Sequence, residues 1–157
     1  MLKKIKPSRV NLSVTVLVNA PAAQVFDRLT DWPVQSQWMV GTTVHATKQA
    51  GRGVGGELSA FTGLRTLGFT DTMVITVWDP PHQCSVTHTG HVVKGNGDFI
   101  VSSVSDEQST FTWSEDFILP YGFLGKLVWP IAKPVVRLGL QISLNQFAHW
   151  AAAKTKV

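Results

Sequence analysis

The stretch PVVRLGLQISLNQFAHWAA, residues 134–152, constrains the fold more than any other part of the chain. Its residues follow a helical period and place apolar side chains on two stripes. One stripe contains Ile131, Val135, Leu138 and Ile142, and the other contains Val136, Leu140, Leu144 and Phe147. A narrow polar strip remains near Arg137 and Gln141. We therefore predict a long helix from about Pro134 to Ala152, covered on most sides, with Pro130 and Pro134 breaking or kinking the segment before it.

The rest of the chain predicts a sheet that can provide this cover. The run VNLSVTVLV, residues 10–18, alternates apolar and polar side chains and predicts a half-buried strand. Two short helices should follow, one with Pro21 in its first turn and one capped by Asp31 before Pro33. Six further strand-like runs then extend from about Thr43 to Phe117. They are TTVHATK, ELSAFTG, FTDTMVITVW, QCSVTHTG, GDFIVSSV and STFTWSEDF, joined by short turn-forming segments.

This order predicts an α+β domain in which a curved antiparallel sheet of about seven strands wraps around the long C-terminal helix. At 157 residues the chain is long enough for one domain, which we place at residues 10–153. Residues 1–9 form a basic N-terminal tail and residues 154–157 a short C-terminal tail. A wrapped sheet also leaves room for a cavity between its concave face and the helix.

The charge distribution argues against nucleic-acid binding. The net charge is +4, but six of the fourteen basic residues lie in the two tails. Residues 10–153 carry eight basic and ten acidic residues, a net of −2, whereas a nucleic-acid module needs a basic face on its folded body. The tails could touch an anionic membrane weakly, although solvated tails are the favoured interpretation.

The sequence indicates neither a metal site nor a cofactor. The single cysteine, Cys84, cannot form an internal disulfide and fits a reducing, cytoplasmic setting. The five histidines lack metal-ligand spacing. The motif G-x-G-x-x-G at Gly51, Gly53 and Gly56 precedes a strand-like run, whereas a dinucleotide site needs a helix there. We therefore interpret it as a loop between strands.

The order of elements resembles the START-like helix-grip superfamily. The segments that carry the resemblance are APAAQVFDRLTDW, WDPP closing a strand, STFTW in the last strand and LPYGFLG before the final helix. This superfamily includes pollen-allergen-like ligand carriers and the polyketide cyclase/dehydrase and lipid-transport group. The resemblance implies a cavity between sheet and C-terminal helix that holds a hydrophobic or amphipathic small molecule. It implies a carrier or sensor first, with a cyclase- or dehydratase-type enzyme as the alternative.

Strand alternation places three ionisable residues among the apolar sets that should face the helix. Asp71 shares a face with Phe69, Met73, Ile75 and Val77. His88 shares one with Cys84 and Val86, and Glu115 shares one with Phe111, Trp113 and Phe117. The alternative is that these groups lie near strand ends, or that a β-bulge reverses the register. If they do converge in an apolar cavity, they are candidate general acids or bases.

The predicted ligand-binding set combines these faces with the helix and with one tryptophan. Its members are Trp38, Phe61, Phe69, Met73, Ile75, Val86, Phe99, Trp113, Glu115, Leu138 and Ile142. In the segment TDWPVQSQWM, residues 30–39, we expect Trp38 to lie nearer the ligand, whereas core packing is an equal alternative for Trp32. The sequence leaves the ligand's identity and the oligomeric state open.

Overall fold

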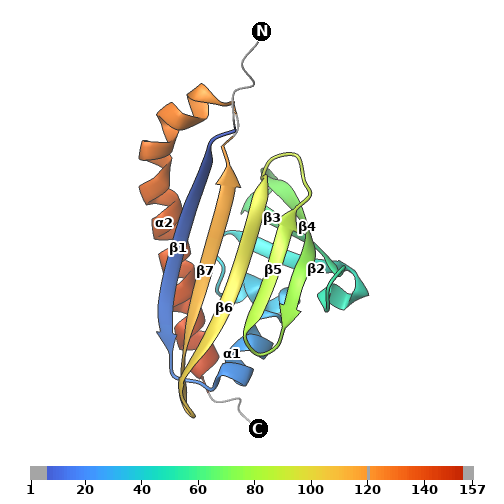
Figure 1. The fold of residues 1–157 in the computed structure, drawn as a ribbon, viewed down its shortest axis with the longest axis vertical. Helices are drawn as coiled ribbons and strands as arrows, with labels where there is room; N and C mark the ends of the chain where they lie inside the picture. Colours follow the sequence, from blue (N-terminus) through green and yellow to red (C-terminus); the bar gives the residue numbers. More distant parts are fainter. Residues whose placement is uncertain (1–6, 120, 154–157) are drawn as a thin grey trace.

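The computed structural model describes residues 7–119 and 121–153, and Figure 1 shows their arrangement. Seven antiparallel strands form one sheet in the order β1-β7-β6-β5-β4-β3-β2. The strands are β1 (Arg9–Val18), β2 (Thr42–Lys48), β3 (Glu57–Leu64), β4 (Leu67–Asp79), β5 (Gln83–His88), β6 (Gly95–Ser105) and β7 (Gln108–Ile118). The helices are α1 (Ala22–Leu29), the 3₁₀ helices η1 (Trp32–Gln37) and η2 (Gln49–Gly51), and α2 (Phe123–Ala152).

The helix-grip α+β architecture predicted from the sequence is confirmed. Strands β2 to β7 form a meander, and β1 joins it by pairing with β7 in a register that sets Leu12 opposite Glu115. The two short helices lie between β1 and β2 as expected. The glycine-rich segment begins at the end of η2 and continues as a loop into β3, so a strand and not a helix follows it.

One strand departs from simple alternation. The pairing of β4 with β5 shifts between Ile75 and Val77, which is the register change of a β-bulge. Val77 is consequently about one-third exposed, and the prediction that it shares the inner face with Ile75 is wrong. Trp78 takes the inner position instead and packs its ring against Phe26, with the ring centroids 5.4 Å apart.

The C-terminal helix begins eleven residues earlier than predicted and is covered along only part of its length. Pro130 and Pro134 lie inside it, and the helix continues through both. Its C-terminal half packs under the sheet, where Leu144, Phe147 and Ala151 are fully buried. Its N-terminal half lies beside β1 and extends beyond it, in orange in Figure 1. The expectation of cover on most sides therefore fails for this half, where Ile131 is 75% exposed.

The packed core lies where the C-terminal half of α2 meets the sheet. Trp38 is fully buried there, with its ring 4.9 Å from that of Phe147 and 6.3 Å from those of Phe111 and Trp113. Edge-to-face packing of this kind stabilises a core beyond the area that it buries. The other half of the concave face is not filled in this way, and it contains the candidate site.

Candidate ligand-binding site

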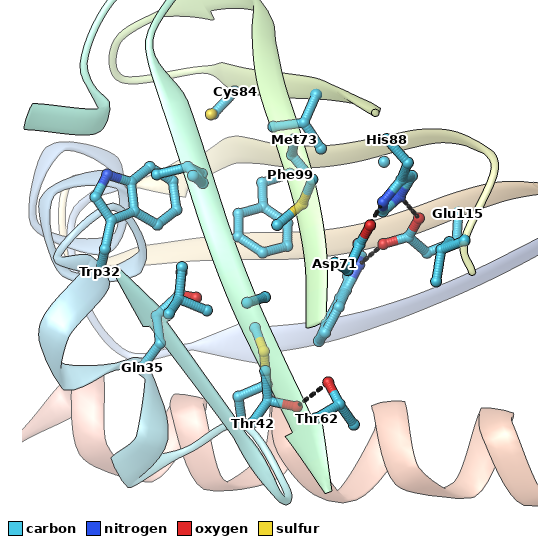
Figure 2. Close-up of a pocket in the computed structure, with 18 of the residues that line it drawn as sticks. Trp32, Gln35, Thr42, Thr62, Asp71, Met73, Cys84, His88, Phe99 and Glu115 are labelled. Atoms are coloured by element: carbon cyan, nitrogen blue, oxygen red, sulfur yellow. Dashed lines mark hydrogen bonds and ion pairs between the residues drawn. The ribbon is translucent and has the colours of Figure 1, made fainter. Parts of the chain in front are cut away.

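A cavity of about 180 Å³ lies on the concave face of the sheet. Its wall comes from η1, from strands β2 to β7 and from the β5–β6 loop, as Figure 2 shows for most of the residues involved. Most lining side chains are apolar, and the cavity is partly open to solvent. No residue of α2, which the structure describes in full, contributes to the wall.

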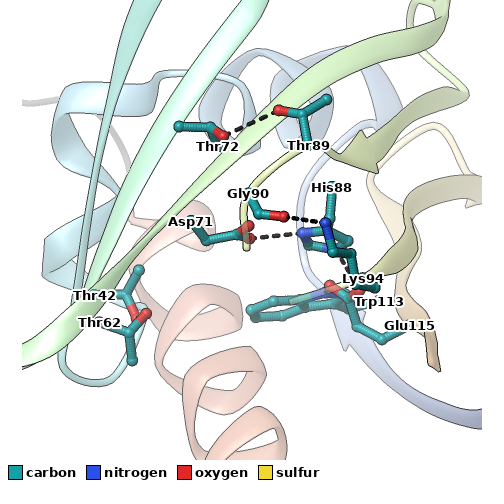
Figure 3. Close-up of polar contacts among 10 residues, drawn as sticks. All are labelled: Thr42, Thr62, Asp71, Thr72, His88, Thr89, Gly90, Lys94, Trp113 and Glu115. Atoms are coloured by element: carbon teal, nitrogen blue, oxygen red, sulfur yellow. Dashed lines mark hydrogen bonds and ion pairs between the residues drawn. The ribbon is translucent and has the colours of Figure 1, made fainter. Parts of the chain in front are cut away.

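Three ionisable side chains converge on one side of this wall. His88 Nδ1 lies 2.6 Å from Asp71 Oδ2, and His88 Nε2 lies 3.2 Å from Glu115 Oε2. Trp113 Nε1 donates to the second carboxylate oxygen, Glu115 Oε1, at 2.7 Å. Figure 3 shows these residues reaching toward one another from strands β4, β5 and β7. All three ionisable side chains are less than 10% exposed.

The local sequence explains why these groups meet. Met73 is the β4 partner of His88, and Gly97 of β6 is paired with Glu115 on one side and Val86 on the other. Alternate residues of a strand share a face, so Asp71 and Met73 point inward together, as do Trp113 and Glu115. A Cβ on Gly97 would lie 3.0 Å from both carboxylate oxygens of Glu115. Glycine at this position therefore makes room for the Glu115 carboxylate.

The loop after β5 supports the Asp71 side of the cluster. Lys94 Nζ donates to the Gly90 carbonyl at 2.7 Å, and Thr89 Oγ1 contacts Thr72 Oγ1 at 3.0 Å. Asp71 Oδ1 is buried beside Gly90 and accepts no hydrogen bond from the described residues. The carboxylate is thus held to the cluster through Oδ2 alone.

The two carboxylates determine the charge of His88. Burial by itself would lower the pKa of the imidazole, but the hydrogen bonds to Asp71 and Glu115 raise the pKa to about 9. At neutral pH the ring is therefore an imidazolium that donates from both nitrogens. Two carboxylates and one imidazolium give this side of the wall a net charge of −1 when both acids are ionised.

Cys84 also lines the cavity, yet its thiol is not activated. Burial, followed by the nearby charge of Asp98, raises the pKa of the thiol to about 12. A neutral thiol is a poor nucleophile, since the thiolate is the reactive form. Among the described residues, no group of three or more metal-binding side chains is positioned to hold a metal ion.

The predicted site residues divide into two groups. Phe69, Met73, Val86, Phe99, Trp113 and the three ionisable candidates line the cavity. Trp38, Phe61, Ile75, Leu138 and Ile142 do not. Trp38 and Ile75 are instead fully buried in the core, while Leu138 and Ile142 are 59% and 41% exposed on α2. The helix positions were misplaced because α2 lies beside β1 rather than across the cavity.

Of the two tryptophans of residues 30–39, the one that lines the cavity is Trp32 and not Trp38, which the sequence analysis placed nearer the ligand. Trp32 lines the cavity, and its indole N–H donates to the Gly51 carbonyl at 2.9 Å. Gly51 has φ +64°, and a Cβ there would lie 2.4 Å from the Trp32 ring nitrogen. Close approach of the glycine loop therefore fixes the ring that forms one wall. Trp38 points into the packed half instead.

Sequence reasoning also missed part of the wall. The residues that it did not name as ligand-binding are Trp32, Gln35, Met39, Thr42, Val44, Leu58, Ala60, Thr62, Cys84, Val93, Gly97 and Phe117. Period-two alternation in TTVHATK and ELSAFTG relates several of these positions, such as Val44 and Ala60, which are paired across β2 and β3. The prediction chose Phe61 on ELSAFTG, whose side chain points to the opposite face of β3 from Leu58, Ala60 and Thr62.

Comparisons with known proteins agree with this architecture. Residues 9–150 match the family model described as polyketide cyclase/dehydrase and lipid transport, and the chain belongs to this family. Among curated proteins, none matches the chain in sequence.

Solved structures share the fold at low sequence identity. The ZhuI aromatase/cyclase from Streptomyces sp. R1128 is 17% identical with a TM-score of 0.76, over 92% of this chain and 94% of that one. A protein from Thermus thermophilus is 9% identical with a TM-score of 0.79, over 94% and 100%. A START superfamily protein from Mycobacterium smegmatis is 14% identical with a TM-score of 0.70, over 89% and 97%.

Proposed function

We propose that the protein binds a small, mostly apolar molecule in this cavity and acts as its carrier or sensor. The observation that supports the proposal is an apolar cavity whose three ionisable wall residues are hydrogen-bonded to one another. Sites for small molecules are typically apolar with a few convergent polar groups. Here those groups are the cluster of Asp71, His88 and Glu115 on one side of the wall.

The size and charge of the cavity define the kind of ligand. Its volume, about 180 Å³, is below the roughly 300–1,000 Å³ of sites for drug-sized ligands. The ligand is therefore compact, or it extends out through the open side. With both acids ionised, the cluster has a net charge of −1 and favours a hydroxyl or other hydrogen-bond donor over a ligand carboxylate.

The hydrogen bonds of the cluster favour binding over catalysis. Both ring nitrogens of His88 and both oxygens of Glu115 are already engaged, and the one acceptor of the cluster without a partner among the described residues, Asp71 Oδ1, is buried beside Gly90. A doubly protonated ring has no lone pair with which to accept a proton, so His88 is not a general base at neutral pH. A carrier needs such a fixed polar surface, whereas a general base needs a free acceptor within reach of the substrate.

Binding can be tested with an uncharged, environment-sensitive dye such as N-phenyl-1-naphthylamine and with two adjacent positions of β5. Val86 lines the cavity, and Thr87 points to the opposite face of the same strand. We expect Val86→Trp to abolish dye binding and Thr87→Trp to retain it, provided that both variants remain folded by circular dichroism. Equal binding by both variants would contradict the proposal. Native mass spectrometry of protein from its own host would then identify the natural ligand.

A second candidate function is a cyclase- or dehydratase-type enzyme that uses the cluster for proton transfer. Its specific support is the concentration of three ionisable groups in an apolar cavity, one of them with a strongly raised pKa, which is a pattern of active sites. In this case a proton of the His88 imidazolium would reach the substrate through Glu115 or Asp71, the two carboxylates that accept its N–H groups. The Cys84 thiol supports no nucleophilic role, as its pKa lies near 12.

Glu115→Gln separates the two functions. For a carrier we expect unchanged ligand affinity and a loss of roughly 1.5–3 kcal/mol in the free energy of unfolding, as for one hydrogen bond to a charged group. For an enzyme we expect unchanged affinity but turnover slowed roughly a hundredfold or more. The retained host ligand, incubated with wild-type protein and analysed by mass spectrometry, reports whether any chemical change occurs.

A further inference from the structure

The N-terminal part of α2 presents a continuous apolar surface to solvent. Its exposed apolar side chains are Phe123, Leu124, Leu127, Val128, Ile131, Val135, Leu138 and Ile142. With about 100° between successive residues, they fall within an arc of about 140° around the helix axis. We call this set the α2 apolar arc. An exposed apolar patch of this extent is uncommon on a soluble protein and marks an interaction site.

The other sides of the same helix have different surroundings. Trp129, Val136 and Leu140 are partly buried on the side toward the sheet, where the Trp129 ring lies 6.3 Å from that of Phe117. Between this side and the arc lie Lys126, Lys133 and Arg137, all exposed. None of these three cations forms an ion pair with a described residue.

The charge on this surface is of one sign. The sequence contains no aspartate or glutamate after Asp116, so every charged side chain of α2 is basic. An apolar arc bordered along one edge by lysine and arginine suits a helix that lies in the interface of an anionic bilayer. The apolar side chains enter the headgroup–acyl boundary, and the cations meet the lipid phosphates and carboxylates.

We propose that the α2 apolar arc, together with Lys126, Lys133 and Arg137, docks the protein on the surface of an anionic lipid membrane. A second copy of the chain fits this surface less well. Symmetric pairing sets the same patch against itself, which would bring the unpaired cations of both copies to one interface. No helix within the described residues is long and apolar enough to cross a bilayer, so α2 would lie on the surface.

The helix that carries the docking surface passes close to the cavity. Ser143, on α2, accepts the backbone N–H of Val40 at 3.0 Å, and the preceding residue, Met39, lines the cavity. Figure 2 shows α2 running past the end of the cavity marked by Thr42 and Thr62. A docked molecule would therefore hold its cavity close to the lipid surface. The docking itself does not depend on whether the cavity binds a ligand.

The electrostatic contribution to membrane docking can be tested by co-sedimentation with phosphatidylcholine vesicles, with and without about 30% phosphatidylserine. We expect wild-type protein to bind the anionic vesicles at least tenfold more tightly, and added salt to weaken that binding. Each basic residue near such a surface contributes about fivefold, so Lys126→Gln/Lys133→Gln/Arg137→Gln should weaken binding about a hundredfold.

The contribution of the α2 apolar arc to membrane binding is tested with the double variant Leu127→Asp/Ile131→Asp. Both positions are well exposed, so we expect the fold and the unfolding midpoint to be unchanged and vesicle binding to fall at least tenfold. Val104→Asp is the matched control, because Val104 is also an exposed apolar residue but lies near the end of β6, outside the α2 apolar arc. This control should bind vesicles like wild type.

Two results would overturn the proposal. The first is that Lys3→Gln/Lys4→Gln/Lys6→Gln removes vesicle binding while the α2 variants retain it, which would assign the binding to the basic tail. The second is a wild-type dimer in analytical ultracentrifugation that Leu127→Asp/Ile131→Asp converts to monomer without changing vesicle binding. That result would make the arc a contact between copies of this chain.

Discussion

The two halves of the sheet's concave face are built from strands with the same alternation of side chains. One half borders a packed core, and the other borders a cavity. Where the C-terminal half of α2 covers the sheet, Phe111, Phe147 and Trp38 fill the space completely. Where α2 lies beside β1 instead, the inner face borders a cavity that contains Asp71, His88 and Glu115. The comparison shows that the position of the helix, rather than the pattern of the strands, separates core from site.

The largest expected effect tests the packed half. Phe147→Ala removes a fully buried ring that contacts Trp38 and Phe111, and we expect it to lower the free energy of unfolding by about 3–5 kcal/mol. Phe123→Ala, the same change at an exposed position of the same helix, should shift it by less than about 0.5 kcal/mol. Equal losses in urea denaturation would show that α2 is packed along its whole length.

The next effect concerns the charge of the cavity cluster. The folded-state pKa of His88, about 9, lies above the ordinary value of 6.5, so the folded protein holds this proton more tightly. The resulting stability is fully present below about pH 6.5 and is lost as pH rises through about 9. We expect the free energy of unfolding to fall by up to about 3 kcal/mol across this pH range. The His88→Gln variant should not show this fall.

An NMR titration of the His88 ring in the wild-type protein provides an independent check that does not require a stable variant. We expect a midpoint near 9. A midpoint at or below 6.5 would mean that the two carboxylates do not hold the imidazolium.

A smaller effect tests the space reserved for Glu115. Gly97→Ala would place a Cβ 3.0 Å from both carboxylate oxygens, forcing the carboxylate away from His88 and Trp113. We expect the free energy of unfolding to fall by about 1–3 kcal/mol, as for other overpacked interiors. Gly139→Ala, in the middle of α2 with no other atom within 4 Å of the new Cβ, should stabilise the protein by about 0.5–1 kcal/mol. Thermal or urea unfolding distinguishes the two, and a neutral Gly97→Ala would contradict the packing described for Glu115.

The smallest expected effect concerns a position that the sequence assigns to the ligand site. Leu138 is 59% exposed, so Leu138→Gln should change the free energy of unfolding by less than about 0.5 kcal/mol and leave dye binding in the cavity unchanged. A marked loss of dye binding would indicate that α2 closes over the cavity when it is occupied.

The sequence by itself determined the order of elements and the inward face of most strands. Successive side chains of a strand point to opposite sides, a property of the backbone that needs no tertiary contact. This is why Asp71, His88 and Glu115 could be placed among the inward-facing apolar side chains, while the sequence left open whether a bulge or a strand end would turn them away. The helix-grip order followed in the same way, from turn residues and from the long apolar helix.

Tertiary structure decided everything that depends on how elements approach one another. The bulge after Ile75 brings Trp78 inward, and the contact with Gly51 makes Trp32 rather than Trp38 a cavity wall. The two apolar stripes of α2 showed that the helix has apolar sides that need cover. They did not show how much of each stripe the sheet covers. Only the packing of the helix along β1 leaves one stripe exposed and opens the cavity, because the hydrophobic effect is non-directional and does not specify which apolar surface provides the cover.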